Sequence, residues 1–168
     1  RAEADFWLPD FVAYMGLKDR FGGKPWYQWP EALRNRSADV IAEAWDYLGS
    51  EGVQFYCFVQ YLFFKQWEKL RDYAHSKGIR IIGDVPIYVP LDSVEVWKDP
   101  QLFQLDENLN PKVVAGCPPD GFTADGQLWG NPIYDWDAMK ADGFSWWIRR
   151  LAAAGKLYDV VRLDHFRG

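Results

Sequence analysis

The chain has 168 residues, of which 49% are apolar and 26% charged, a balance typical of a globular protein with one core of ordinary size. Its net charge of −5 argues against nucleic-acid and anionic-membrane partners, since both attract basic surfaces. No apolar run reaches the roughly 18 residues that a membrane span needs. Aromatic residues make up 18% of the chain. A core uses many of these rings, but flat aromatic faces also stack on sugars, which favours a carbohydrate ligand.

Helical periodicity is clear in two segments of the first half. Residues 5–21 carry apolar side chains at helical spacing, and Gly22-Gly23 provides a stop. Residues 24–30 then predict a loop rich in aromatic rings. The strongest pattern covers residues 54–77. At about 1.5 Å per residue, this second helix would be roughly 35 Å long.

Two β-branched apolar runs each follow a helical segment directly, an order typical of buried parallel strands. These runs cover residues 79–85 and 158–164. A helix over residues 136–154, ended by Gly155, would form the crossover between them. Residues 90–135 are rich in proline and glycine and predict a long functional loop with a possible short helix at 92–98. The fold class predicted from this order is α/β.

Each predicted strand carries a carboxylate near its C-terminal end, namely Asp84 and Asp164. Side chains alternate along a strand, so Arg162 and Asp164 share a face. The guanidinium would lower the pKa of Asp164 and keep it ionised, as a nucleophilic carboxylate requires. From the residues alone, Asp84 fits a turn cap equally well, and the Arg162–Asp164 pair also fits an inert ion pair.

Cysteine and histidine usage gives no sign of a metal site. Cys57 and Cys117 stand in unlike contexts and predict two reduced thiols rather than a disulfide framework or zinc ligands. His75 and His165 do not form a ligand pair, and no glycine-rich loop suits a phosphate. The sequence therefore predicts no metal and no cofactor. Because the chain starts at Arg1 and both ends look cut, we expect an internal fragment of a longer protein.

Three sequence blocks carry a family resemblance: GIRIIGDVPIYVPLDSVEVW, GCPPDGFTADGQLWGNPIYDW and YDVVRLDHFRG. With FVQYLFFKQW and FGGKPWYQWP, they resemble the 4-α-glucanotransferases of glycoside hydrolase family 77, also called amylomaltases or disproportionating enzymes. The resemblance implies that residues 1–168 are one segment of an α-amylase-type (β/α)8 TIM barrel, helix-rich and with inserted loops. Residues 5–76 would form a helical insertion, and residues 90–135 an active-site loop.

The same resemblance implies an activity, retaining transfer of an α-1,4-glucan segment to the 4-OH of an acceptor through a glycosyl-enzyme intermediate, without a cofactor. Asp164 would be the nucleophile, and Arg162 would orient it. The acid/base carboxyl comes from a later strand in the family and is not assigned in this chain. The side chains that would bind substrate are Asp84, Trp129, Asn131, Phe122 and His165.

The chain departs from the family at Gly121, a lid position next to Phe122 where the family often has an aromatic residue. We therefore expect a lid that is either more mobile or less adhesive to sugar. His165 fits a packed strand-end histidine as well as it fits a sugar contact.

The expected partners are maltooligosaccharides and glucans derived from starch or glycogen, with no nucleic acid and no membrane. The expected location is the cytoplasm, or the plastid if the protein comes from a plant. Two alternatives stay open: an α-amylase-type hydrolase, against which GQLWGNP argues, and an inactive glucan-binding fragment that lacks the acid/base residue. The fragment alone is expected to be inactive.

Overall fold

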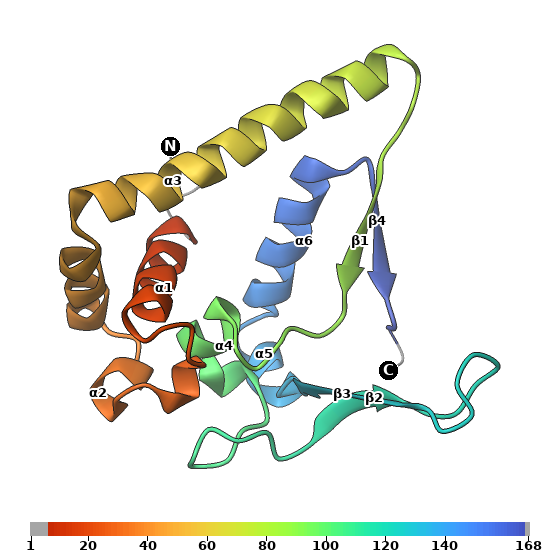
Figure 1. Ribbon diagram of the computed structural model, residues 1–168. Helices are drawn as coiled ribbons and strands as arrows, with labels where there is room; N and C mark the ends of the chain where they lie inside the picture. The colour runs from red at the N-terminus through yellow and green to blue at the C-terminus, as the bar shows by residue number, and fades with distance from the viewer. Residues whose placement is uncertain (1–6, 167–168) are drawn as a thin grey trace. The chain divides into compact units, whose positions relative to one another are not determined.

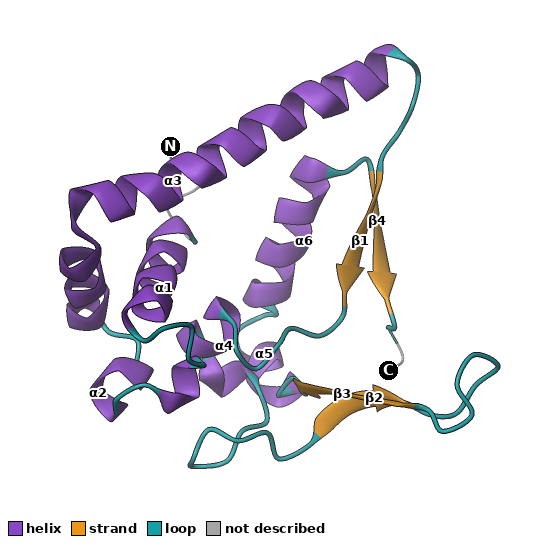
Figure 2. Cartoon of the chain, in the orientation of Figure 1, coloured by secondary structure: helices purple, strands orange, loops and turns teal. Residues whose placement is uncertain are grey.

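A computed structural model describes residues 7–166 (Figure 1). The chain divides into two compact units, one made of Arg1–Lys65 with Asp92–Lys98 and the other of Gln66–Leu91 with Asp99–Gly168. Figure 2 shows that helices dominate the first unit and that all strands belong to the second. Within the described residues, no helix combines the length and the apolarity needed to cross a membrane.

In the first unit, α1 (Leu8–Arg20) confirms the helix predicted over 5–21, with Trp7 and Phe21 flanking it as caps. Residues 5 and 6 lie outside the described part of the chain. Pro9 occupies the first turn, where its missing N–H costs nothing. The aromatic loop that follows contains one 3-10 turn, η1 (Trp26–Gln28). The remaining short helices are α2 (Glu31–Arg34) and α4 (Val94–Lys98), and α4 confirms the short helix predicted near 92–98.

The long helix α3 (Ala38–Ser76) begins much earlier than the predicted residue 54. It continues across Gly49, whose φ of 64° and ψ of 178° interrupt the helical backbone. Glycine tolerates this conformation because it has no Cβ. The sequence pattern identified only the segment after this kink, since the glycine breaks the periodicity that joins the two parts.

Two carboxylates organise the first unit. The buried Asp10 accepts a hydrogen bond from Arg36 Nε at 2.5 Å and pairs with Lys98 Nζ at 2.7 Å, so its charge is neutralised from α4 and from the segment before α3. Asp92 joins the start of the α4 segment to α1 and to the aromatic loop. Its carboxylate accepts hydrogen bonds from Tyr14 Oη, Lys18 Nζ and the Trp26 backbone N–H, at 2.7, 2.7 and 3.2 Å.

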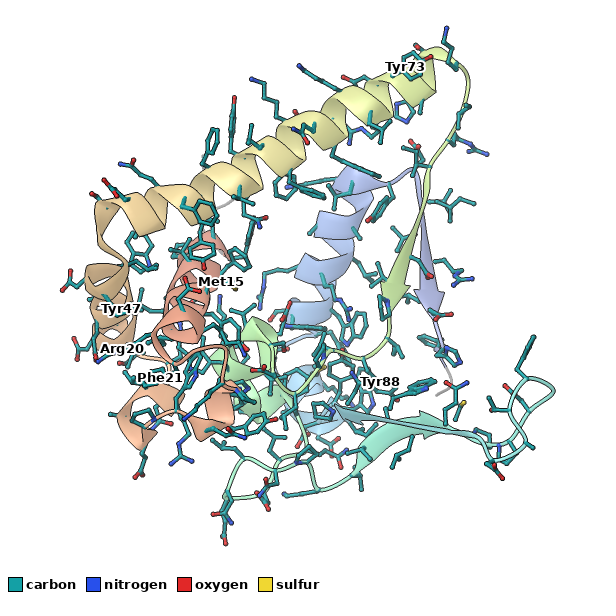
Figure 3. All side chains as sticks on the ribbon, viewed as in Figure 1. Met15, Arg20, Phe21, Tyr47, Tyr73 and Tyr88 are labelled. Carbon is teal, nitrogen blue, oxygen red and sulfur yellow. The ribbon has the colours of Figure 1, made fainter. Side chains whose placement is uncertain are left out.

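Many aromatic rings of this unit pack in its interior, as expected for part of the aromatic content. The Arg20 guanidinium lies 5.5 Å from the ring centres of both Phe21 and Tyr47, and Figure 3 shows these side chains together. The fully or almost fully buried rings are Tyr14, Trp26, Trp29 and Trp97.

In the second unit, β1 (Ile82–Pro86) and β4 (Val160–Asp164) lie side by side and pair in parallel (Figure 1). This confirms the predicted parallel pairing, and α6 (Ser145–Leu157) packs against both strands. The prediction that both strands are buried is wrong, because Ile82 and Val160 are 68% and 43% exposed. Among residues 7–166 this sheet has two strands, so each strand keeps an open edge and α6 cannot cover both faces.

Asp159 fixes the start of this strand pair. Its carboxylate accepts a hydrogen bond from the Ile81 backbone N–H at 2.8 Å and lies 2.9 Å from His75 Nε2. These partners lower the pKa of Asp159, the Ile81 N–H being the main cause. The contacts join the beginnings of both strands to the end of α3.

Gly83 lies against the Tyr158 ring, which leaves no space for a side chain at this position. A Cβ at this position would lie 1.9 Å from Tyr158 Cδ2, so Gly83→Ala forces the Tyr158 ring away from its contact with Trp67. We expect this variant to lose about 1–3 kcal/mol of unfolding free energy, from urea unfolding of the chain followed by tryptophan fluorescence. Gly155→Ala is the control: a Cβ there meets nothing within 4 Å. The control should gain up to about 1 kcal/mol, and equal stability of the two variants would contradict the prediction.

The prediction of a long loop over 90–135 is only partly correct. Besides α4 and η2 (Pro100–Leu102), this segment contains an antiparallel hairpin of β2 (Val114–Cys117) and β3 (Gln127–Pro132). The hairpin needs glycine at position 116, since a Cβ there would lie 2.4 Å from the Gln127 carbonyl oxygen. Glycine and proline favoured a loop in the sequence, whereas here glycine permits the close approach of two strands.

The single helix predicted over 136–154 is also wrong in its bounds. The structure has α5 (Trp136–Ala141) and then α6, separated by a turn in which Gly143 and Phe144 have positive φ. Asp142 stabilises the start of α6, because its side chain accepts hydrogen bonds from Ser145 N–H at 3.1 Å and Ser145 Oγ at 2.7 Å. Gly155 does not end the helix; an interior glycine costs only about 1 kcal/mol, which packing offsets.

Candidate active site

The carboxyl ends of β1 and β4 bring three charged side chains together. The strand register places Asp84 opposite Arg162, and Pro86 opposite Asp164. Arg162 donates from Nε and Nη2 to the two carboxylate oxygens of Asp84, at 2.9 and 2.6 Å, and from Nη2 to Asp164 Oδ1 at 3.3 Å. The guanidinium therefore bridges the carboxylates of two neighbouring strands.

This geometry adds a second partner to the one expected for Arg162. The sequence paired it with Asp164 on its own strand, but its two shorter hydrogen bonds go to Asp84. The Arg162 hydrogen bonds lower the pKa of Asp84, and Asp84 in turn raises the pKa of Arg162. Asp84 is thus a stable carboxylate, whereas one oxygen of Asp164 keeps only the longer contact with the guanidinium.

His165 lies beside Asp164 and has an unusual backbone conformation. Its φ is 52°, in the left-handed region that only a few non-glycine residues adopt and that often marks a functional site. Its ring nitrogen Nδ1 lies 3.2 Å from Asp164 Oδ2. The ring meets Trp129 edge to face with centroids 4.6 Å apart. His165 is therefore part of the charged cluster and is not a packed strand-end histidine.

Strand β3 contributes the aromatic side of the cluster. Trp129 donates from Nε1 to Gln127 Oε1 at 2.9 Å, which fixes its indole next to His165. Asn131 stands two residues further along β3, beyond an irregularity in the strand pairing at which Gly130 has a φ of 79°. Gln127 was not expected from the sequence, although a polar residue two positions before the tryptophan on one strand face was a usable signal.

Phe122 lies outside this cluster. It is 97% exposed in the loop that joins β2 to β3, so its ring has the solvent exposure expected of a lid residue. Asp120 shapes this loop by accepting backbone hydrogen bonds from Phe122 N–H and Thr123 N–H, at 2.8 and 2.9 Å. These N–H groups, with a smaller contribution from the charge of His165, lower the pKa of Asp120. Asp120 was not expected from the sequence, although Asp-Gly in PPDGF is a turn signal.

The described residues contain no group of three or more His, Cys, Asp or Glu side chains placed to hold a metal ion. An open cavity of about 760 Å³ lies beside Trp136 and Asp106, away from all the predicted site residues. Asp106 already accepts hydrogen bonds from the Asn108 and Asn110 backbone N–H groups at 2.8 and 2.9 Å. The charged cluster at the strand ends is therefore the better candidate for chemistry.

A parallel strand pair with a helical crossover and carboxylates at its carboxyl ends is the unit from which (β/α)8 barrels build their active sites, and the chain shares this fold class with the solved structure that it matches. The whole chain matches an amylomaltase from Streptococcus agalactiae solved in complex with acarbose, with a TM-score of 0.87 and 46% identity. The chain belongs to the 4-alpha-glucanotransferase family of glycoside hydrolases, family 77, whose profile matches residues 1–168.

Curated relatives support the same assignment. A 4-alpha-glucanotransferase of Thermus thermophilus is 51% identical over 168 residues, which is 100% of this chain and 33% of that protein. The protein of that name from Aquifex aeolicus is 49% identical over 99% of this chain and 34% of its own length. A chloroplastic/amyloplastic relative from Solanum tuberosum is 45% identical over 96% of this chain and 28% of its own. The chain spans about a third of the length of the relatives that it matches.

Proposed function

We propose that this chain forms the nucleophile-bearing part of a 4-α-glucanotransferase, which cuts an α-1,4-glucan and passes the released segment to the 4-OH of an acceptor with retention of configuration. The observation that carries this proposal is the bridge that Arg162 makes between Asp84 and Asp164 at the strand ends. Such a bridge holds the Asp164 carboxylate in a fixed place beside a cation, and covalent glycosyl transfer needs a carboxylate nucleophile that is held in position.

Asp164 is the proposed nucleophile. Its carboxylate would attack the anomeric carbon to form a β-glycosyl-enzyme, while an acid protonates the leaving oxygen. A retaining acid/base carboxyl stands about 5–5.5 Å from the nucleophile and must be protonated when the bond breaks. Asp84 does not suit that role, because Arg162 lowers its pKa and occupies both of its oxygens. We assign Asp84 to the binding of sugar hydroxyls, and no residue of this chain to the acid/base role.

The remaining predicted residues provide sugar-binding surface. The Trp129 and His165 rings meet edge to face beside Asp164. Asn131 follows on β3 with an amide that can donate and accept hydrogen bonds. The exposed ring of Phe122 on the hairpin loop is suited to cover an acceptor sugar and exclude water. Substrates of this chemistry are maltooligosaccharides and longer α-1,4-glucans, and the acarbose bound by the amylomaltase relative supports an oligosaccharide ligand.

We also propose that residues 5–76 are an insertion and that residues 90–135 border the active site in the complete barrel. The bacterial and plastid relatives support a location in the cytoplasm or, for a plant protein, in the plastid.

The proposal is tested in a chimaera in which this segment replaces the matching third of the Thermus thermophilus relative. The chimaera is incubated with maltotriose, and the products are separated by chromatography. Transfer yields glucose together with a ladder of longer maltodextrins. Shorter sugars alone would identify a hydrolase, and maltodextrin binding without turnover would identify a binding module; either result would refute the proposal.

The glycosyl-enzyme can react with an acceptor sugar or with water, and we expect Phe122 to favour the sugar. In the chimaera, Phe122→Ala should lower the ratio of transfer to hydrolysis about three- to tenfold, because one ring–sugar contact of ordinary strength is lost. The control is Leu128→Ala, which removes another exposed apolar side chain, 81% exposed, from the same hairpin. Both ratios are measured from glucose release and ladder formation with maltotriose. An equal change in the two variants would contradict a specific role for Phe122.

A further inference from the structure

Two side chains outside the charged cluster converge on the backbone just after β1. Arg150 of α6 donates from Nη2 to the Pro86 carbonyl oxygen at 2.7 Å and from Nη1 to the Ile87 carbonyl oxygen at 3.2 Å. Tyr134 donates from its hydroxyl to the same Ile87 oxygen at 2.6 Å. Arg150 Nη1 also lies 3.3 Å from the Tyr134 hydroxyl oxygen. Neither residue was expected from the sequence.

One peptide unit links this clamp to the nucleophile. The Pro86 carbonyl and the Ile87 N–H belong to the same peptide plane, which is rigid. Its oxygen is held by Arg150, and its N–H donates to the Asp164 carbonyl oxygen at 3.2 Å. A guanidinium on the carbonyl also polarises the peptide and makes the N–H a stronger donor. Arg150 is thus separated from the backbone of Asp164 by a single peptide.

The surroundings hold the clamp in place. Tyr134 has no solvent-exposed surface, and its ring stacks on Tyr88 at a centroid distance of 5.8 Å. The Arg150 guanidinium lies 5.2 Å from the Trp146 ring centre and 5.0 Å from that of Trp147. Cation–π contacts of this kind restrict the guanidinium to one orientation. The aromatic content of this unit therefore serves the alignment of a strand end as well as the filling of a core.

We propose that Arg150 and Tyr134 are positioning residues that set the alignment of Asp84 on β1 against Asp164 on β4. The inference rests on the proposed function of these carboxylates. Pro86 lacks an N–H, so the preceding Val85–Pro86 peptide donates no hydrogen bond, and the clamped Pro86–Ile87 peptide makes the contact with Asp164 at this end of β1. Without the clamp, the end of β1 can shift relative to β4, and the Arg162 bridge loses its geometry. Displacement of a reacting group by about 1 Å costs on the order of a hundredfold in rate.

The experiment uses the same chimaera with Arg150→Met, Arg150→Lys and Tyr134→Phe, and with Arg149→Met as the matched control. Arg149 is the exposed neighbour on the same helix. The measurements are kcat and KM for maltotriose transfer and the thermal midpoint. We expect Arg150→Met to lower kcat about ten- to a hundredfold with little change in KM, because the sugar-binding faces stay intact. We expect Arg150→Lys to restore only part of the lost kcat, because lysine lacks the planar guanidinium fork that reaches several acceptors.

A structural role alone would lower the thermal midpoint but leave kcat of the folded variant close to that of the control, whereas a positioning role lowers kcat of the folded variant at an almost unchanged KM. Should Arg150→Met not fold, Tyr134→Phe, which loses only a hydroxyl, and Arg150→Lys decide by the same readouts. Folded variants with kcat within about twofold of the control would overturn the inference. If the unsubstituted chimaera and Arg149→Met both lack transfer, the proposed function itself fails.

Discussion

Asp164→Asn is expected to abolish glucan transfer in the chimaera, with kcat falling on the order of 10⁴-fold, as when another covalent catalyst loses part of its machinery. Asparagine has almost the same shape and keeps the contact with Arg162 Nη2 possible, so the change removes charge and nucleophilicity and little else. A neutral amide oxygen does not form a productive glycosyl-enzyme. The measurement is the initial rate of ladder formation from maltotriose, with the thermal midpoint recorded to show that the variant folds.

The control for this variant is Asp137→Asn, which removes a carboxylate from an exposed position in the first turn of α5 and should keep full activity. A second measurement separates the nucleophile from a binding residue. Asp164→Gly with α-glucosyl fluoride and azide should produce β-glucosyl azide, because the small anion takes the place of the missing carboxylate on the β face. Undiminished transfer by Asp164→Asn, or no azide product with a folded Asp164→Gly, would contradict the assignment.

Arg162→Lys is expected to cause the second largest loss, about 10²- to 10³-fold in kcat. Lysine preserves the charge, but an ammonium cannot make the two parallel hydrogen bonds to Asp84 and the third to Asp164 that the guanidinium fork makes. The preorganised bridge is therefore lost while the net charge is kept, and losses of this size are typical when one preorganised donor is removed. Steady-state kinetics with maltotriose measure the effect, and Arg149→Lys serves as the control. A variant with more than about a tenth of the control activity would show that charge alone suffices.

The same bridge predicts how stability depends on pH. Arg162 lowers the pKa of Asp84 below its ordinary value of 3.8, so the folded state binds this proton less readily than the unfolded state. The contribution is present above pH 3.8 and is lost as the pH falls through the lowered pKa. In Arg162→Met this contribution should be missing, so the variant should differ most from the unsubstituted protein at neutral pH and least in acid. Thermal midpoints of Arg162→Met and of the unsubstituted protein, measured from neutral to acid pH, test this prediction. A difference between the two midpoints that grows in acid would contradict it.

Local pattern in the sequence was sufficient for the strands that carry the site. The runs 79–85 and 158–164 are β-branched, follow helices and stand on either side of a helical segment, and these features predict parallel pairing. Alternation along a strand placed Arg162 and Asp164 on one face. The resemblance in blocks such as RLDHFRG identified the family, which the comparisons confirm. All of this information lies within short stretches of chain.

What the sequence did not provide depends on residues far apart in the chain. The partner of the Arg162 fork is Asp84 on the other strand, and the alignment of the two strands shows this only once they are paired. The glycines and prolines around β2 and β3 predicted a loop. In the structure, glycine instead permits the close approach of the two strands, which is visible only when the facing strand is known.

The sequence by itself determined the family, the α/β order of elements and the residue types of the site, because local periodicity and motifs encode them. Only the tertiary structure decided which groups meet, such as Arg150 with the Pro86 carbonyl and His165 with Trp129. The physical reason is that hydrogen bonds and ring contacts act over a few ångströms of space, whereas sequence patterns report only on neighbours along the chain.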